Sequence, residues 1–245
     1  MIEDKLPFVA HLKELRDRIL ICILAVGVAF IGTYYFKERI FGFLMRPFTK
    51  VMPPQSSFIF TSLTEAFLTY FKIALVASLF VAAPVILYEV WKFVSPGLYD
   101  KEKRYIIPFI SFGSIFFLIG GLFCYFVVMP TVYRFFVSYA GPYIVPMPTL
   151  KEYMNLTLKL LVIFGFIFEM PLVAYYLSRV GIIKYRTLAK KRRYAILAIV
   201  VVSAIITPPE LTSQILMALP MYALFEVSVL IARVFGKREK AHADS

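Results

Sequence analysis

Long apolar runs separated by short polar stretches dominate the pattern along the chain. Six runs are candidates for membrane-spanning helices, at residues 19–36, 67–94, 105–130, 156–178, 194–206 and 211–232. A helix needs about 20 mostly apolar residues to cross a bilayer. The pattern therefore predicts an all-α polytopic membrane protein with six transmembrane helices in a single domain, residues 1–245.

The last two runs are unusual. The fifth has 13 residues, or about 20 Å of helix against a hydrocarbon core of about 30 Å. The sixth begins almost directly after Pro209 and is interrupted by Pro220 and Glu226. Such mismatch thins the bilayer locally or requires protein neighbours to cover it. We expect short fifth and sixth spans.

Prolines recur inside the apolar runs, at Pro84, Pro171 and Pro220. A proline in a helix interior removes one backbone hydrogen bond and typically bends the helix. Bent spans pack poorly against each other and leave grooves open to lipid or to partner helices. Several Pro-kinked spans are therefore expected.

Two polar stretches next to the spans carry their own helical pattern. Residues 1–18 have apolar positions at helical spacing and predict an amphipathic tail helix at the cytoplasmic interface, with Glu14 and Arg18 on its wetter side. In the loop 37–66, residues 40–44 predict a second amphipathic segment, which we expect to end at Arg46-Pro47 and to rest on the outer interface.

Composition and charge placement support the membrane assignment. The chain is 60% hydrophobic with a mean hydropathy of +0.78, whereas soluble domains are about 45–50% apolar. A net charge of +12 could indicate nucleic-acid binding, but 19 of the 27 Lys and Arg residues fall on the side that holds both termini. The positive-inside rule places that side, and the tail 235–245, in the cytoplasm. No nucleic-acid partner is expected, and residues 19–36 are predicted to be a retained span rather than a cleaved signal peptide.

Glu169 lies near the middle of the fourth apolar run. A charged group at that depth costs roughly 2.5 kcal/mol or more, so intramembrane carboxyls usually face a partner, a cavity or a substrate path. A neutral carboxyl, hydrogen-bonded inside the helical bundle, is the plainer alternative.

Little in the sequence supports catalysis. The only histidines, His11 and His242, lie in the predicted cytoplasmic tails, and no hydrolase motif is present. Cys22 and Cys124 fall inside apolar runs and are interpreted as small apolar side chains rather than a disulfide or metal pair. We expect no enzyme activity, no cofactor and no metal.

Four strings in order along the chain carry a family resemblance. They are HLKELRDR (11–18), FVSPGLYDKEKR (93–104), FGFIFEMP (164–171) and TPPELTSQILMALPMYALFE (207–226). The chain resembles the TatC family, whose members belong to the twin-arginine (Sec-independent) protein translocase. The resemblance implies a receptor core that binds twin-arginine signal peptides. With TatA and TatB, this core supports proton-motive-force-driven transport of folded proteins across the bacterial inner membrane or the thylakoid membrane.

The resemblance also implies which residues recognise the signal peptide. Glu14 and Glu102 match the cytoplasmic recognition positions, and Arg16, Arg18 and Phe93 are the further signal-peptide-binding candidates. A guanidinium fits a carboxylate bidentately and an ammonium does not, so two glutamates could select paired arginines. From spacing alone, Glu14 could instead pair with Arg18 at i+4, and Glu102 could be a solvated loop charge.

Further positions are implied for the membrane interior and for partners. Glu169, Glu210, Gln214 and Glu226 are the intramembrane polar and partner-contact candidates, although the family commonly has Asp where this chain has Glu210. For Glu226, structural pairing is as good an interpretation as docking of a partner helix. Pro47 and Pro84 match positions that shape the chain. The family also implies contact with membrane lipid and a homo-oligomer within a TatBC-type complex.

Two other functions compete with this interpretation. A proton-coupled secondary transporter of a small solute would use Glu169 as its titrating carboxylate, but such folds usually contain internal repeats, and none is evident here. A passive scaffold would explain the grooves and leave Glu14 and Glu102 without a role. Binding of a twin-arginine signal peptide, compared with its twin-lysine form, separates the three.

Overall fold

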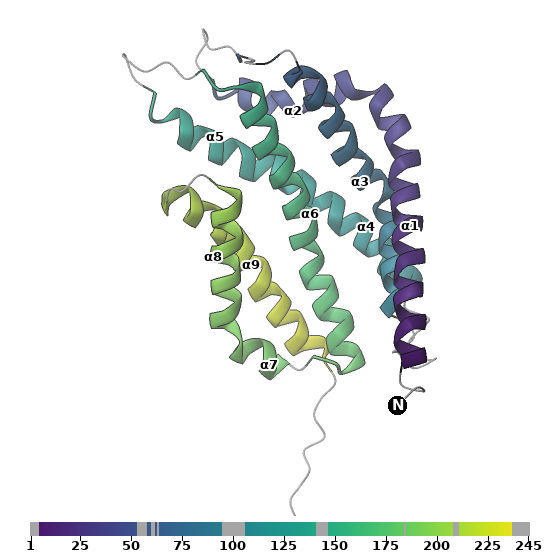
Figure 1. Cartoon of the computed structure of the whole chain (residues 1–245). Helices are drawn as coiled ribbons and strands as arrows, with labels where there is room; N and C mark the ends of the chain where they lie inside the picture. Colours follow the sequence, from purple (N-terminus) through teal and green to yellow (C-terminus); the bar gives the residue numbers. More distant parts are fainter. Residues whose placement is uncertain are drawn as a thin grey trace, which may run out of the picture. The chain divides into compact units, whose positions relative to one another are not determined.

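The computed structural model describes residues 5–52, 58, 59, 62, 64–94, 106–140, 147–183, 185–207 and 211–236. These residues are almost entirely helical (Figure 1). The elements are α1 (Lys5–Tyr35), α2 (Lys37–Thr49), α3 (Glu65–Val94), α4 (Ile106–Phe123), the π-helical turn η3 (Cys124–Val128), α5 (Met129–Val137), α6 (Leu150–Val180), α7 (Tyr185–Lys190), α8 (Arg192–Ile206) and α9 (Leu211–Phe235). The predicted all-α class is confirmed.

Five helical segments of the described chain are long and apolar enough to cross a membrane. They are His11–Tyr35, Glu65–Phe93, Ile107–Val137, Leu150–Val180 and Leu211–Phe235. The segment predicted as the fifth span, α8, has 15 residues, about 22 Å of helix against a core of about 30 Å. It is a short helix, as predicted, whereas the segment predicted as a short sixth span forms α9, which has 25 residues and is long enough to cross. The count of six complete crossings stays a prediction.

The chain divides into two compact units, Met1–Phe164 and Gly165–Ser245. In the first unit, α1 packs along the length of α3 (Figure 1). The Thr33 hydroxyl donates a 2.8 Å hydrogen bond to the carbonyl of Ala74, and the rings of Phe30 and Phe71 lie 5.0 Å apart. A hydroxyl that bonds a main-chain oxygen of the neighbouring helix is satisfied without water, as an apolar surrounding requires.

The tail predicted at residues 1–18 is not a separate element. One helix runs without a break from Lys5 to Tyr35. No proline or glycine lies between residues 8 and 26, so nothing in the backbone ends a helix before the apolar run begins. The pattern of polar residues changes near residue 18 while the backbone conformation does not.

The segment predicted at residues 40–44 forms α2, but it does not end at Arg46-Pro47. Pro47 lies inside the helix, which continues to Thr49. A proline at this position cannot donate to the carbonyl of Phe43, four residues earlier. The Tyr125 hydroxyl supplies the missing donor at 2.7 Å, and the Tyr153 hydroxyl donates to the carbonyl of Leu44 at 2.6 Å. Two tyrosines therefore stabilise the carbonyls beside the proline and anchor α2.

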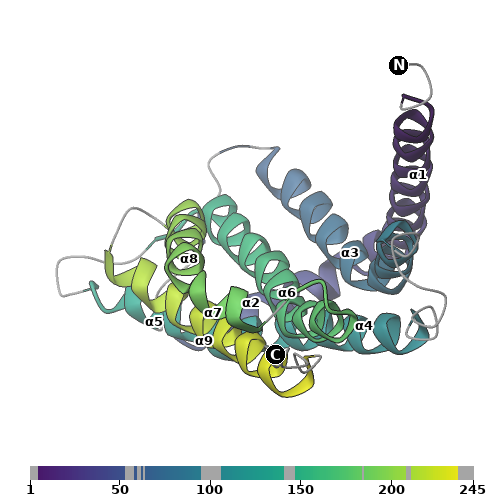
Figure 2. The same ribbon diagram turned by 90° about the horizontal axis from the view of Figure 1, so that it is seen from below.

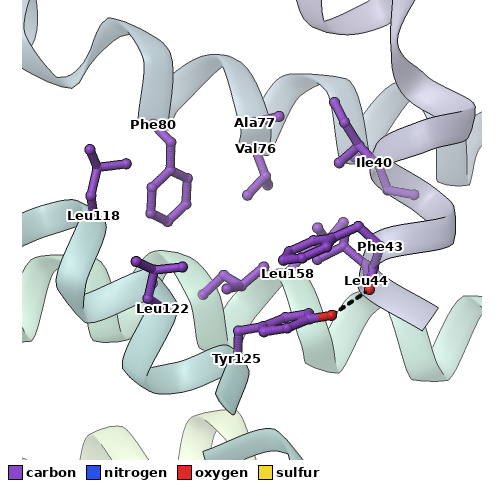
Figure 3. A pocket seen from close by; sticks show the side chains of 13 residues that line it. Ile40, Phe43, Leu44, Val76, Ala77, Phe80, Leu118, Leu122, Tyr125 and Leu158 are labelled. Atoms are coloured by element: carbon purple, nitrogen blue, oxygen red, sulfur yellow. Dashed lines mark hydrogen bonds between the residues drawn. The ribbon is translucent and has the colours of Figure 1, made fainter. Parts of the chain in front are cut away.

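Figure 3 shows the hydrogen bond between Tyr125 and the carbonyl of Phe43, which lies beside an apolar cavity of about 210 Å³. The rings of Phe43 and Tyr125 lie face to face, with centroids 4.2 Å apart. Nearby, Phe48 of α2 packs against Tyr133 and Tyr153 at 5.2 Å and 4.7 Å. The first unit thus has an aromatic core where α2, α5 and α6 meet.

The third predicted span also continues past its expected end at Pro130. The helix passes through η3 and α5 to Val137. In η3 the Met129 amide donates to the carbonyl of Cys124, five residues back. This wider turn directly precedes Pro130 and makes room for a ring that would otherwise press on the preceding turn.

In the second unit, α8 and α9 form an antiparallel hairpin (Figures 1 and 2). The Thr207 hydroxyl donates to the carbonyl of Ser203 at 2.8 Å where α8 ends. At the end of α6, Gly181 has a φ of 93°. The amides of Gly181 and Ile182 both donate to the carbonyl of Leu177, which closes the helix with a left-handed glycine. The kinks expected at Pro84, Pro171 and Pro220 stay predictions, although all three prolines lie inside helices.

We expect Tyr125→Phe to lower the free energy of unfolding by about 1 kcal/mol, because the carbonyl of Phe43 then has no donor. The stacked ring remains, so packing is preserved. Thermal unfolding in detergent measures the effect. Tyr35→Phe is the matched control, since Tyr35 is 82% exposed, and an equal loss in both variants would contradict the assigned role.

Candidate functional site

Arg18 lies between two carboxylates at the end of the first unit where α1 begins and α3 ends. One amino group of its guanidinium donates to Glu14, one turn earlier on α1, and the other donates to Glu89 of α3 at 3.1 Å. The side chains of Arg18 and Glu89 are 12% and 7% exposed. A single guanidinium thus bridges two acids in a largely desolvated place, where charge-assisted bonds are strong.

A groove of about 370 Å³ opens over this cluster. Its walls carry both signs of charge and one apolar side chain, contributed by Lys13, Glu14, Asp17, Arg18, Ile21, Glu89 and Lys92. The Glu14 side chain is 34% exposed, so it can be reached from outside while it holds Arg18. We call this feature the α1–α3 groove.

An aromatic stack lies next to the groove. The rings of His11 and Phe93 are 4.4 Å apart and nearly parallel, at 17°. Nδ1 of His11 lies 3.8 Å from Oε2 of Glu14. The structure therefore brings Glu14, Arg18 and Phe93, three of the five signal-peptide-binding candidates, to one end of the α1–α3 pair.

Other predicted residues are placed elsewhere or lie outside the described part of the chain. Arg16 is 65% exposed and donates two hydrogen bonds to Asp17, at 2.7 Å and 2.9 Å, and it does not line the groove. Glu102 and Glu210 lie outside the described residues. Their predicted roles stay predictions.

Sequence reasoning missed Glu89. It is a carboxylate within the second apolar run, near the C-terminal end of that run, and is 5% exposed. The signal was available, because the same grounds make Glu169 a candidate. A charged acid in an apolar run is costly without a cation, and Arg18, directly before the first apolar run, was the candidate.

The polar residues of the second unit differ in how they are satisfied. Glu226 accepts a hydrogen bond from Tyr222 at 2.8 Å and one from Arg192 at 2.9 Å. The bond to Glu226 raises the pKa of the Arg192 guanidinium above its usual value. Gln214 donates to the carbonyl of Val200 at 3.0 Å. Glu226 and Gln214 therefore join α9 to α8, which favours the structural interpretation of Glu226.

Glu169 on α6 is different. The residue is 7% exposed, and within the described part of the chain neither carboxylate oxygen has a hydrogen-bond partner. A buried polar group without a partner is costly and calls for an explanation. The hydrogen-bonded alternative considered from sequence thus finds no partner among these residues.

Two of the sequence expectations concern metal ligands and cysteines. No group of three or more His, Cys, Asp or Glu side chains there could hold a metal ion. Cys22 and Cys124 are both free thiols.

These features fit a helical membrane protein with a charged groove at one end of the α1–α3 pair, and comparison with known proteins identifies the family. The model for the Sec-independent protein translocase protein (TatC) matches residues 10–220. The TatC of Desulforapulum autotrophicum is 46% identical over 237 residues, covering 97% of this chain and 88% of that protein. The TatC of Escherichia coli K12 is 38% identical over 234 residues, covering 96% and 91%.

A crystal structure of a twin-arginine translocase receptor, TatC, superposes with a TM-score of 0.84 at 37% identity. It covers 91% of this chain and 98% of that one. The chain belongs to the TatC family, and it is a multi-pass protein of the bacterial inner membrane. The family is a protein translocase component and not an enzyme, and these matches do not support the small-solute transporter.

We expect Arg18→Gln to lower the free energy of unfolding by about 3 kcal/mol or more, because Glu89 is left buried without a cation. Adding Glu89→Gln removes that charge and should restore most of the loss. Arg16→Gln is the matched control and should stay within about 0.5 kcal/mol, because Arg16 is exposed. Additive losses in the double variant would show that the two side chains do not act as a pair.

Proposed function

We propose that this chain is the receptor subunit of the twin-arginine translocase and binds twin-arginine signal peptides at its cytoplasmic face. The observation that carries the proposal is that Glu14, partly exposed at the α1–α3 groove, already accepts a hydrogen bond from a guanidinium, that of Arg18. The family match and the likeness to a crystal structure of a twin-arginine translocase receptor also support this proposal.

The charge distribution supports the proposed orientation. Lys and Arg are concentrated on the side of the termini and of the loop after α3, which the positive-inside rule assigns to the cytoplasm. The α1–α3 groove lies on that side, because α1 begins there and α3 ends there. Both termini are then cytoplasmic, and the groove faces the compartment where precursors fold.

Guanidinium chemistry explains why the signal would carry arginine rather than lysine. Arg18 shows how this groove treats a guanidinium, since two carboxylates take different amino groups of one planar fork. One oxygen of Glu14 is taken by Arg18, and the other faces His11 at 3.8 Å. This second oxygen is the acceptor for an arriving arginine, with Glu102 taking the second arginine.

The remaining predicted contacts concern partners. We place the single-span subunits TatA and TatB against the polar positions of the second unit, with Glu169 as the intramembrane contact and Glu210 and Gln214 near the outer end of α9. An unpartnered carboxyl inside an apolar span supports this, because a polar residue of a partner helix would satisfy it. Several copies of the chain then act together within a TatBC-type complex, and the proton-motive force drives transport of folded cargo.

We expect wild-type protein to bind a twin-arginine signal peptide at least tenfold more tightly than its twin-lysine form. Glu14→Gln and Glu102→Gln should each weaken binding by about tenfold or more, because a charge-assisted bond contributes about 1.5–3 kcal/mol. The double variant should lose the preference for arginine. A fluorescence binding assay in detergent or native membranes measures the affinity of the wild type and of each variant for both peptides.

Glu38→Gln is the control for these two substitutions. Glu38 is an exposed carboxylate on α2, away from the α1–α3 groove, and its loss changes net charge equally. The receptor assignment would be wrong if the variant without the Glu14 and Glu102 carboxylates bound the signal peptide as tightly as wild type and still preferred arginine to lysine.

We expect Glu169→Ala to reduce transport of a folded reporter at least tenfold while the protein still accumulates in the membrane. The physical reason is loss of the one buried carboxyl that α6 presents without an internal partner among the described residues. Glu152→Ala removes an exposed carboxylate from the same helix and should leave transport unchanged. Full-rate transport by Glu169→Ala would remove this residue from the mechanism.

A further inference from the structure

Two lysines stand within apolar spans of the first unit and take no part in the proposed signal-binding groove. Lys72 lies on α3 and Lys159 on α6, both exposed. A cation on a membrane-spanning segment is costly unless it meets an anion or reaches the interface. Each of these two lysines therefore has to meet an anion or extend to the interface.

The beginnings of α3 and α6 are held together, so the two lysines lie on helices that run the same way. Residues Ile59 and Thr149 form an isolated parallel bridge. A carboxylate oxygen of Glu65, at the start of α3, accepts a 2.7 Å hydrogen bond from the amide of Lys151 at the start of α6. Both helices start at the same end of the unit (Figure 1).

A groove of about 370 Å³ contains both lysines, and its lining changes from polar to apolar along its length. On α3, Lys72 is followed one turn later by Leu75 and Val76. On α6, Lys159 is followed one turn later by Val162 and Ile163. The groove therefore has a cationic end toward the starts of the helices and an apolar end deeper in the membrane.

The cationic end has one internal polar contact. The ammonium of Lys72 donates to Oδ1 of Asn155 at 2.9 Å. Because the amide oxygen of Asn155 accepts this bond, its amide nitrogen is a further donor at the groove. Among the residues that the structure describes, neither lysine forms an ion pair. Two positive charges and a donor thus line a site with no negative charge of its own.

We propose that this groove binds an anionic phospholipid, with the head-group phosphate between Lys72 and Lys159 and an acyl chain along the apolar end. The occupant is a lipid rather than a free phosphate because the apolar lining continues directly from the cations, in the order in which a phospholipid presents its parts. In the proposed orientation the lipid belongs to the outer leaflet. The site requires only that α3 and α6 span the membrane, so it stands apart from the receptor proposal.

The test is titration of the purified full chain with phosphatidylglycerol or phosphatidylcholine, with bound lipid counted by native mass spectrometry. We expect wild type to bind phosphatidylglycerol at least tenfold more tightly than phosphatidylcholine. K72Q/K159Q should lose at least tenfold in affinity for phosphatidylglycerol, because each lysine near a lipid surface contributes about a factor of five.

Two further variants separate lipid binding from loss of charge or of folding. K50Q/K151Q removes the same charge from exposed sites outside the groove and should bind phosphatidylglycerol like wild type. V162W fills the apolar end, keeps both lysines and should also lose affinity. Thermal unfolding confirms that each variant is folded.

The contrary results are equally definite. Unchanged phosphatidylglycerol binding by folded K72Q/K159Q would overturn the site, and equal binding of phosphatidylcholine would show that charge plays no part. Displacement of the lipid by inorganic phosphate, beyond that by sodium chloride of matched ionic strength, would assign the cations to a free anion. Displacement by an acidic single-span peptide would assign the groove to a partner helix.

Discussion

The hydrocarbon core offers no hydrogen-bond partner, so the protein must satisfy its own polar groups within the membrane. Most of the fold's specific contacts follow from this constraint. Thr33 donates to the main chain of α3, and Tyr125 and Tyr153 donate to carbonyls of α2. Arg18 satisfies two carboxylates at once. Against this background the Glu169 carboxyl stands out, because it has no hydrogen-bond partner among the described residues.

The long apolar runs were sufficient to predict the main helices, because hydrophobicity alone decides whether a segment is stable in lipid. Helix ends were predicted less well. Pro47 and Pro130 were interpreted as ends, yet both lie inside helices, because a tyrosine hydroxyl from a distant segment and a π-helical turn compensate for them. Neither form of compensation can be predicted from the local sequence. The tyrosine hydroxyl acts through a tertiary contact, and the π-helical turn depends on a change in the hydrogen-bond register of the backbone.

The site shows the same division between local and tertiary information. The i+4 pairing of Glu14 with Arg18 could be predicted from spacing, and the structure confirms it. The need of Glu89 for a cation was visible in the sequence, but that it shares one guanidinium with Glu14 depends on the packing of α1 along α3. Pairing and recognition, first weighed as alternatives for Glu14, are compatible, because a carboxylate has two oxygens and Arg18 bonds only one of them.

The attachment of α2 through main-chain oxygens has a consequence for sequence divergence. Any amino acid supplies a carbonyl, so substitutions at positions 43 and 44 change packing without removing an acceptor. The positions that tolerate little change are the two hydroxyl donors, Tyr125 and Tyr153, and Pro47, which leaves the carbonyl of Phe43 without a main-chain donor. Substitutions along α2 can therefore change the side chains on its surface while its position in the fold is preserved.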